Sequence, residues 1–261
     1  MTNTPESAYA AYAAWRDIAQ TGPIDLSIVI PAYNEQSRIV PTIGAFAAHL
    51  ALSSLTWELI VSDDGSRDAT RALIDVLDHA NVRVVEAPAN EGKGSAVKRG
   101  FAVARGRMVL FADADNATPA DQLDGLIARI EAGADVAIGS RAVVGADVAN
   151  RTLVRRTLTA GLRALVRVGL GIGVADTQCG FKLFTAEAAH RISTAQTVDG
   201  FSFDLEMLHL AERFGYVIAE VPVRWFDAPG STVHPSREAV RFVLSIVRIR
   251  FRSLNGAYRH A

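Results

Sequence analysis

Apolar and polar positions alternate along the first half of the chain in a regular order. Short apolar runs lead into polar or glycine-rich segments, and the runs cover 26–30, 57–61, 82–86, 108–112 and 136–139. Helical periodicity follows each of the first four runs. The helical stretches cover about 39–52, about 68–80, the residues after the segment 90–94 as far as 104, and about 121–132. This order predicts βαβ units around a mainly parallel sheet. Because ligands bind at the carboxyl ends of such strands, the polar segments indicate the binding face.

The second half of the chain is less regular and predicts longer helices. Residues 151–169 form a basic helical pattern with an apolar stripe, and 203–214 and about 236–254 also read as helices. A turn and strand are expected over 176–184, and a strand over 216–225. We expect three parts: a helical lead at 1–23, one α/β domain at 24–235, and a basic amphipathic helix at 236–261.

Composition narrows the class of protein. The chain has 261 residues, of which 49% are hydrophobic, and it has one cysteine. This composition excludes an intrinsically disordered chain, and one cysteine excludes a disulfide framework. No apolar run approaches 18 residues, and the first 20 residues lack a signal-peptide pattern. We therefore expect a cytoplasmic protein.

The net charge of −1 conceals an uneven distribution of charge along the chain. Residues 151–171 contain five arginines and no acid, and residues 237–261 contain six arginines and one glutamate. Local basic surfaces therefore matter more than the sum. Nucleic acid is not expected as the partner of these surfaces, because no nucleic-acid-binding motif accompanies them.

Asp113 and Asp115 are the most informative pair of residues for chemistry. They directly follow the apolar run 108–112. Carboxylates two positions apart at a strand end can both face a hard divalent cation, which prefers oxygen ligands and shares them with phosphates. A solvated turn is the alternative for an isolated Asp-x-Asp. The neighbouring polar strand ends favour the metal.

Two further polar segments follow strands. Asp63 and Asp64 lie in a Ser-Asp-Asp-Gly-Ser segment that can begin a helix, and one carboxylate can also accept a hydrogen bond from a base. Lys93 lies in the segment Asn-Glu-Gly-Lys-Gly at 90–94, whose backbone amides suit an anion. Neither a Walker loop nor a dinucleotide fingerprint is present, which argues against an ATPase and an NAD enzyme.

These segments carry a family resemblance that covers about residues 26–259. PAYNE at 31–35, SDDGSRDAT at 62–70, NEGKGSAVKRGFAVARG at 90–106 and DADNATPADQ at 113–122 resemble an inverting family 2 glycosyltransferase. DTQCGFKLF at 176–184 and the segments 199–216 and 220–233 resemble the dolichyl- or polyprenyl-phosphate β-glucosyltransferase branch, and less closely the dolichol-phosphate mannose synthases. The resemblance implies a GT-A fold: an α/β, mostly parallel, Rossmann-like sheet flanked by helices.

The resemblance also implies roles for individual residues. Asp113 and Asp115 would hold Mg²⁺ or Mn²⁺ against the donor diphosphate, where the metal acts as a Lewis acid. Asp63 or Asp64 would contact the base, with no choice made between them. The remaining nucleotide-binding residues would be Pro31, Ala32, Tyr33, Glu35 (near the ribose), Lys93 and Ala114.

The residues predicted to bind the acceptor are four basic residues and one acidic residue. A polyprenyl monophosphate is mostly dianionic at neutral pH, so it needs cations to hold it more than it needs a base. The candidates are Arg141, Arg155, Arg156 and Lys182. Asp176 would position the acceptor or act as a base, with a turn cap as the alternative. Cys179 reads as a packing residue. His234 reads as an ordinary loop histidine, with a contact to the metal or the acceptor as the alternative.

The resemblance implies transfer of a hexose from UDP-glucose to polyprenyl phosphate with inversion. UDP-N-acetylhexosamine or GDP-mannose as donor, or a soluble acceptor, are the enzymatic alternatives; a nucleotide-sugar-binding subunit is the non-enzymatic one. A C-terminal helix with an apolar face and an arginine rim predicts peripheral attachment to the inner face of the membrane, and a core helix with solvated arginines is the alternative. The apolar residues are Phe242, Val243, Ile246, Ile249 and Phe251, and the arginines are Arg241, Arg248, Arg250 and Arg252. A small membrane protein is a further expected partner.

Overall fold

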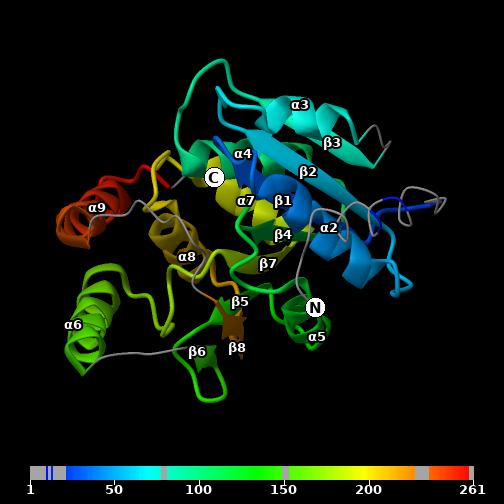
Figure 1. Ribbon diagram of the computed structural model, residues 1–261. Helices are drawn as coiled ribbons and strands as arrows, with labels where there is room; N and C mark the ends of the chain where they lie inside the picture. Colours follow the sequence, from blue (N-terminus) through cyan, green and yellow to red (C-terminus); the bar gives the residue numbers. More distant parts are fainter. Residues whose placement is uncertain are drawn as a thin grey trace.

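The computed structural model describes residues 22–77, 81–148, 153–226 and 235–258, and also residues 10 and 13, with the backbone alone for 148, 153–160, 162 and 235–241. The predicted helical lead at 1–23 therefore lies almost entirely outside the described residues. In the described part, a seven-stranded sheet is flanked by helices on both faces (Figure 1). The predicted α/β fold with a mostly parallel sheet is confirmed.

The sheet has the strand order β3-β2-β1-β4-β7-β5-β8. Neighbouring strands are parallel except β7, which runs antiparallel between β4 and β5. The strands are β1 Leu26–Ala32, β2 Trp57–Asp63, β3 Val82–Glu86, β4 Met108–Ala112, β5 Val136–Ser140, β7 Phe181–Thr185 and β8 Ile218–Pro222. A separate short pair joins β6 Asp147–Val148 to β9 Arg224–Trp225.

The helices form two layers, because side chains alternate between the two faces of each buried strand. Ile28 and Ile30 face a core with α2, α3 and α5, whereas Val29 faces a core with α4, α6, α7, α8 and α9. The helices are α2 Ile39–Leu50, α3 Thr70–Asp75, α4 Lys93–Val103, α5 Leu123–Glu131 (after a 3₁₀ turn at Ala120–Gln122), α6 Leu153–Leu170, α7 Ala186–Ala195, α8 Phe203–Phe214 and α9 Pro235–Leu254.

Most predicted elements are present with shifted ends, and one helix was missed. The strand expected over 216–225 is divided into β8 and β9, with Val223 buried between them. Helix α7 was not predicted, although Thr185 is a recognisable N-cap whose hydroxyl accepts the N–H of Ala188. Ile192 is the one large apolar residue on the buried face of this alanine-rich helix, so the cap was the clearer signal.

Helices α6 and α9 contact one another on the same side of the molecule, beyond α8 (Figure 1). Phe242, Ile246 and Ile249 of α9 are buried in the core that α8 shares. The expectation that this apolar face meets a membrane is therefore wrong for these three residues, because they pack inside the protein. The helices within the described residues include none that is long and apolar enough to cross a bilayer.

Candidate active site

The carboxyl ends of three adjacent strands bring the predicted donor-site residues to one edge of the sheet. Strand β1 lies between β2 and β4, and all three run in the same direction. Pro31 and Ala32 therefore end β1 beside Asp63, which ends β2, while Asp113 follows directly after β4. The sequence-based expectation that these polar ends meet is confirmed by the sheet register.

Asp113 is held by its backbone and paired with a cation. Its N–H donates to the carbonyl of Gly180 at 3.0 Å, and its Oδ1 lies 2.5 Å from Nζ of Lys93. Burial acts to lower the pKa of Lys93, but nearby carboxylates, above all Asp113, raise it by more. The pKa of Lys93 therefore lies above its usual value. Lys93 therefore stays an ammonium and places a positive charge at the predicted metal carboxylate.

Asp115 follows in a tight turn after the strand. Its carboxylate accepts the N–H of Ala117 at 3.1 Å, and Asn116 between them has a left-handed φ of 52°. The carbonyl of Ala114 accepts a hydrogen bond of 2.7 Å from the hydroxyl of Thr42 on α2. These contacts fix the backbone of the triplet and leave the Asp115 carboxylate half-exposed beside Asp113.

The residues present fit a divalent cation that shares its ligands with a substrate. The metal ligands would be the carboxylates of Asp113 and Asp115. The ammonium of Lys93, which contacts Asp113, shows that this carboxylate has room for a cation. A Cβ at position 180 would collide with the Asp113 carboxylate, so Gly180 leaves the space that this side chain needs. Among the described residues no cluster contains three or more candidate metal ligands, so phosphate and water must complete the shell.

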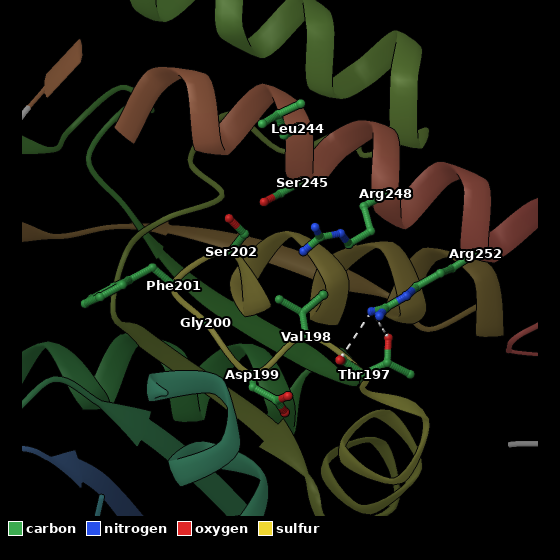
Figure 2. A pocket seen from close by; sticks show the side chains of 10 residues that line it. All are labelled: Thr197, Val198, Asp199, Gly200, Phe201, Ser202, Leu244, Ser245, Arg248 and Arg252. Atoms are coloured by element: carbon green, nitrogen blue, oxygen red, sulfur yellow. Dashed lines mark hydrogen bonds between the residues drawn. The ribbon is translucent and has the colours of Figure 1, made fainter. Parts of the chain in front are cut away.

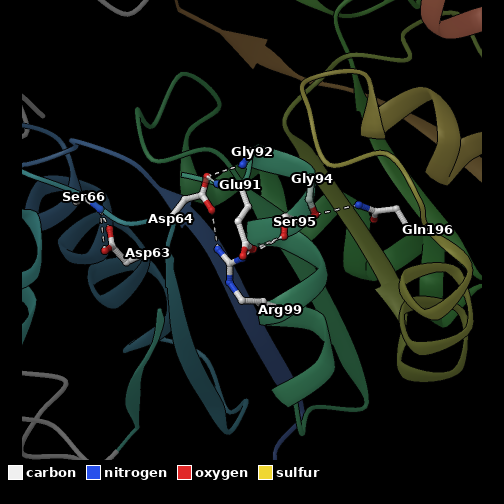
Figure 3. Close-up of polar contacts among 9 residues, drawn as sticks. All are labelled: Asp63, Asp64, Ser66, Glu91, Gly92, Gly94, Ser95, Arg99 and Gln196. Carbon is white, nitrogen blue, oxygen red and sulfur yellow. Dashed lines mark hydrogen bonds and ion pairs between the residues drawn. The ribbon is translucent and has the colours of Figure 1, made fainter. Parts of the chain in front are cut away.

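Asp63 and Asp64 are both buried, and both carboxylates are already hydrogen-bonded within the protein (Figure 3). Asp63 accepts the N–H and the hydroxyl of Ser66, which is the turn-forming alternative. Asp64 accepts the N–H of Gly92 at 2.7 Å and pairs with Arg99 at 2.7 Å. Asp64 therefore connects the end of β2 to the segment that precedes α4.

The segment before α4 is also held from its other side. The carbonyl of Asp199 accepts the N–H of Gly94 at 2.7 Å. Nε2 of Gln196 donates to the carbonyl of Gly94 at 2.9 Å (Figure 3). Gly92 has a φ of 116°, which favours glycine. The sequence reasoning missed Arg99, Gln196 and Asp199, because their role depends on contacts between distant parts of the chain.

Glu35 and Tyr33 lie just beyond β1. Glu35 forms a two-point ion pair with Arg38, at 2.6 and 2.8 Å, and its N–H donates to the hydroxyl of Thr70. Burial raises the pKa of Glu35 above its ordinary value, although Arg38 opposes this shift. Tyr33 is 40% exposed, so its ring is accessible at the edge of the site.

Arg141 and Asp176 form one unit at the end of β5. The guanidinium of Arg141 contacts both carboxylate oxygens, at 2.8 and 3.0 Å, and stacks 5.3 Å from the centre of the Trp225 ring. Burial acts to raise the pKa of Asp176, but the hydrogen bonds and charge of Arg141 lower it overall. Asp176 therefore holds Arg141 in place at the end of β5.

Lys182 lies on β7 with its side chain fully buried. Its Nζ contacts Asp204 and the carbonyl of Cys179, each at 2.5 Å. This placement does not fit the prediction that Lys182 binds an acceptor phosphate, because the cation is enclosed with its own carboxylate. Burial raises the pKa of Cys179 to about 11, in agreement with a packing role. The side chains of Arg155 and Arg156, and all of His234, lie outside the described residues.

Comparison with known proteins identifies the family. Residues 27–193 match the model of glycosyl transferase family 2. The dolichyl-phosphate beta-glucosyltransferase of Dictyostelium discoideum is 37% identical over 260 residues, which cover 93% of this chain and 80% of that protein. The enzyme of the same name from Homo sapiens is 35% identical over 254 residues, covering 90% and 77%.

Solved structures show the same fold. Glucosyl-3-phosphoglycerate synthase from Mycobacterium tuberculosis, in complex with Mn²⁺ and uridine-diphosphate-glucose, aligns with a TM-score of 0.62 and 24% identity over 93% of this chain and 83% of that one. The same enzyme with phosphoglyceric acid aligns with a TM-score of 0.63, also at 24% identity, over 95% and 82%. At this identity the likeness shows the shared GT-A architecture.

The metal-type carboxylate pair, the strand order and the matched relatives agree with one another. The chain belongs to glycosyl transferase family 2, and within it to the polyprenyl-phosphate glucosyltransferase branch.

Proposed function

We propose that this protein transfers glucose from UDP-glucose to a polyprenyl phosphate such as dolichyl phosphate. A phosphate oxygen of the lipid attacks the anomeric carbon, the bond from that carbon to the UDP oxygen breaks, and UDP leaves with the bonding electrons. Attack from the opposite side inverts the anomeric configuration, so the product is a β-linked lipid phosphate sugar. Matched relatives carry the name of this reaction over most of the chain.

One observation supports the proposal more than any other: Asp113, Asp115 and Lys93 meet at the carboxyl end of β4. Asp113 and Asp115 would hold Mg²⁺ or Mn²⁺, which would neutralise charge on the leaving diphosphate as a Lewis acid. Lys93 adds a positive charge beside them. The acceptor phosphate is already a dianion, so its attacking oxygen needs no general base to remove a proton. It needs only to be held in line behind the anomeric carbon.

The finer expectations belong to the same proposal. The acceptor is a lipid, so we propose that the protein works at the inner face of the membrane as a peripheral protein, next to a small membrane-protein partner. The exposed apolar residues of α9 (Leu244, Val247, Phe251) and its arginines support such attachment. We further propose one catalytic unit at 24–235, with the C-terminal helix at 236–261 as its membrane-facing extension.

The test is a panel of nucleotide sugars with a short-chain polyprenyl phosphate, with the product resolved by mass. UDP-glucose should give a hexosyl lipid phosphate, while GDP-mannose and UDP-N-acetylglucosamine give at most a few per cent of that rate. Transfer to phosphoglycerate in place of the lipid would replace the proposal with the soluble-acceptor alternative.

Replacement of one metal carboxylate tests the assignment of the site. Asp115→Ala should lower transfer by at least about a hundredfold, since it removes charge stabilisation at the leaving group, with the thermal unfolding temperature nearly unchanged. Asp124→Ala, an exposed carboxylate on α5, is the matched control and should retain full activity. A fully active Asp115→Ala variant would exclude this pair as the metal site.

A further inference from the structure

A groove of about 490 Å³ separates α9 from the segment 197–202, which precedes α8 (Figure 2). We call it the α9 groove. One wall is formed by residues 197–202, and the other by Leu244, Ser245, Arg248 and Arg252 of α9. None of the sequence-predicted site residues lines it.

The α9 groove carries positive charge that the protein does not neutralise. Within the part of the chain that the structure describes, Arg248 has no hydrogen bond or ion pair, and Arg252 donates to the hydroxyl and carbonyl of Thr197. Figure 2 shows both side chains extending from α9 toward the 197–202 segment. The carboxylate of Asp199, which also lines the groove, points away from α9 in this view. Two guanidinium groups with free donors suit a phosphate.

The rim of the groove is apolar and exposed. Leu244 and Phe201 line it with 60% and 67% of their surface exposed. From Leu244 an exposed apolar stripe continues along α9 through Val247, Phe251 and Leu254, at spacings of three and four residues. Inorganic phosphate has no apolar part that could contact this stripe. A phosphate joined to an apolar chain would contact both the arginines and the stripe.

The groove adjoins the predicted catalytic centre. The ring of Phe201 lies with its centre 5.9 Å from Nζ of Lys93, which pairs with Asp113. The carbonyl of Asp199 accepts the N–H groups of Gly94 and Ser95. The 197–202 segment therefore has two roles: it forms one wall of the groove, and through the carbonyl of Asp199 it holds the segment at the start of α4. A ligand in the groove lies next to the donor site.

Two of the cations predicted for the acceptor are already paired within the protein. Lys182 is enclosed with Asp204, and Arg141 is paired with Asp176. We propose that the α9 groove binds the acceptor lipid, with Arg248 and Arg252 on its phosphate and the stripe from Leu244 to Leu254 on its first isoprene units. This inference rests on the proposed function, and it names where that substrate lies.

Kinetics with a long-chain polyprenyl phosphate in detergent micelles test the proposal. Arg248→Gln should raise the KM for the lipid phosphate about tenfold, and the double variant with Arg252→Gln should raise it further, since charge-assisted hydrogen bonds are lost. The KM for UDP-glucose should stay within about twofold of the wild-type value. Arg250→Gln, an exposed arginine of α9 that does not line the groove, is the matched control.

The apolar part has its own test. Leu244→Ser should raise the KM for a long-chain acceptor more than for a short-chain one, because the chain loses its contact at the groove rim. An equal effect on both acceptors would overturn the assignment of the stripe. Thermal unfolding of each variant confirms that the exposed substitutions leave the fold intact.

Three outcomes would overturn the proposal. A rise in the KM for UDP-glucose alone would place Arg248 at the nucleotide. An unchanged KM for the lipid in micelles, with lost flotation on acceptor-free anionic vesicles, would make the groove a site for bilayer headgroups. An unchanged KM and unchanged flotation would leave the arginines without a ligand.

Failure of the proposed function is recognisable separately, because the wild-type protein would then transfer glucose to no polyprenyl phosphate. The groove is tested in that case by calorimetry with farnesyl phosphate, farnesol and inorganic phosphate. Binding of farnesyl phosphate that is weakened about tenfold in Arg248→Gln supports a lipid phosphate site. Equal binding of inorganic phosphate, or no binding, overturns it.

Discussion

At the scale of single residues, the ion pair between Lys93 and Asp113 bears on the predicted metal site. Lys93 contacts Asp113 at 2.5 Å, where the sequence places a metal ligand. The same oxygen cannot accept both cations at full strength, because the two repel one another. If Asp113 binds a divalent ion as predicted, the ammonium would compete with that ion when no nucleotide is bound, and it would contact the diphosphate when one is present.

We expect Lys93→Met to strengthen Mn²⁺ binding without nucleotide and to weaken sugar transfer. A partly exposed ion pair contributes roughly 1 kcal/mol, so the gain in Mn²⁺ affinity is about threefold to tenfold. Electron paramagnetic resonance titration of Mn²⁺ measures the first effect, and the KM for UDP-glucose the second. Arg129→Met on α5 is the control. Weaker Mn²⁺ binding in Lys93→Met would contradict the competition.

The pair of Arg141 and Asp176 makes stability depend on pH. Folding lowers the pKa of Asp176 below its usual value of 3.8, so its stabilising contribution is present above about pH 4. The contribution is lost as the pH falls through the lower folded value, where the carboxylate takes up a proton.

Asp176→Asn should lower the free energy of unfolding at pH 7 by about 2–3 kcal/mol, because Arg141 keeps its charge in a half-buried place without a partner. The difference from wild type should shrink as the pH falls below about 4. Urea unfolding at a series of pH values measures both effects. Asp75→Asn, which removes an exposed helical ion pair, should change stability by at most about 0.5 kcal/mol. A constant difference at all pH values would contradict this interpretation.

At the scale of elements, the end of α9 is fastened to the segment that forms both the groove and the support of the donor site. Tyr258 donates a 2.6 Å hydrogen bond to the fully buried carboxylate of Glu206, which also accepts the N–H groups of Thr197 and Val198. Burial raises the pKa of Tyr258, and the Glu206 carboxylate raises it further, so the phenol remains a donor. Glu206 thereby connects the C-terminal residues to 197–202.

Tyr258→Phe should lower the free energy of unfolding by about 2 kcal/mol, because a buried carboxylate loses a donor. Tyr216→Phe is the matched control, since the Tyr216 hydroxyl has no hydrogen-bond partner among the described residues. Its loss should be near zero. Urea unfolding of the two variants gives the comparison, and equal losses would show that the Tyr258 bond contributes nothing specific.

At the scale of the whole molecule, α9 exposes a row of apolar residues (Leu244, Val247, Phe251 and Leu254) together with the exposed arginines Arg248 and Arg250. Anionic lipid attracts arginines near its surface by about 1 kcal/mol each, and the apolar stripe adds burial in the headgroup region. Because salt screens the first contribution, attachment should weaken as ionic strength rises.

Flotation with anionic vesicles that lack acceptor should bring the protein to the top at low salt and leave a smaller share there at high salt. Phe251→Asp should reduce the floating share severalfold, since it places an acid in the stripe. Leu52→Asp, which is 91% exposed after α2, is the control and should float as wild type does. Protein that stays at the bottom at low salt would contradict peripheral attachment.

The sequence was informative where the signal lies within one segment of chain. Alternating periodicity predicted the strands that carry Asp63 and Asp113 at their ends, and the family segments agreed with that placement. Helix α7 and the antiparallel position of β7 were not predicted, because strand order depends on pairing between distant segments. The partners of Asp64, namely Arg99 and Gly92, were missed for the same reason.

The sequence by itself determined the fold class and predicted that polar residues, among them Asp113 and Asp115, lie at one edge of the sheet. Periodicity and strand-end position are local properties, so they can be read along the chain. The tertiary structure decided which cations are available. It enclosed Lys182 with Asp204 and left Arg248 unpaired beside residues 197–202. Whether a charge meets a partner or a ligand depends on distance in space, which a linear pattern does not contain.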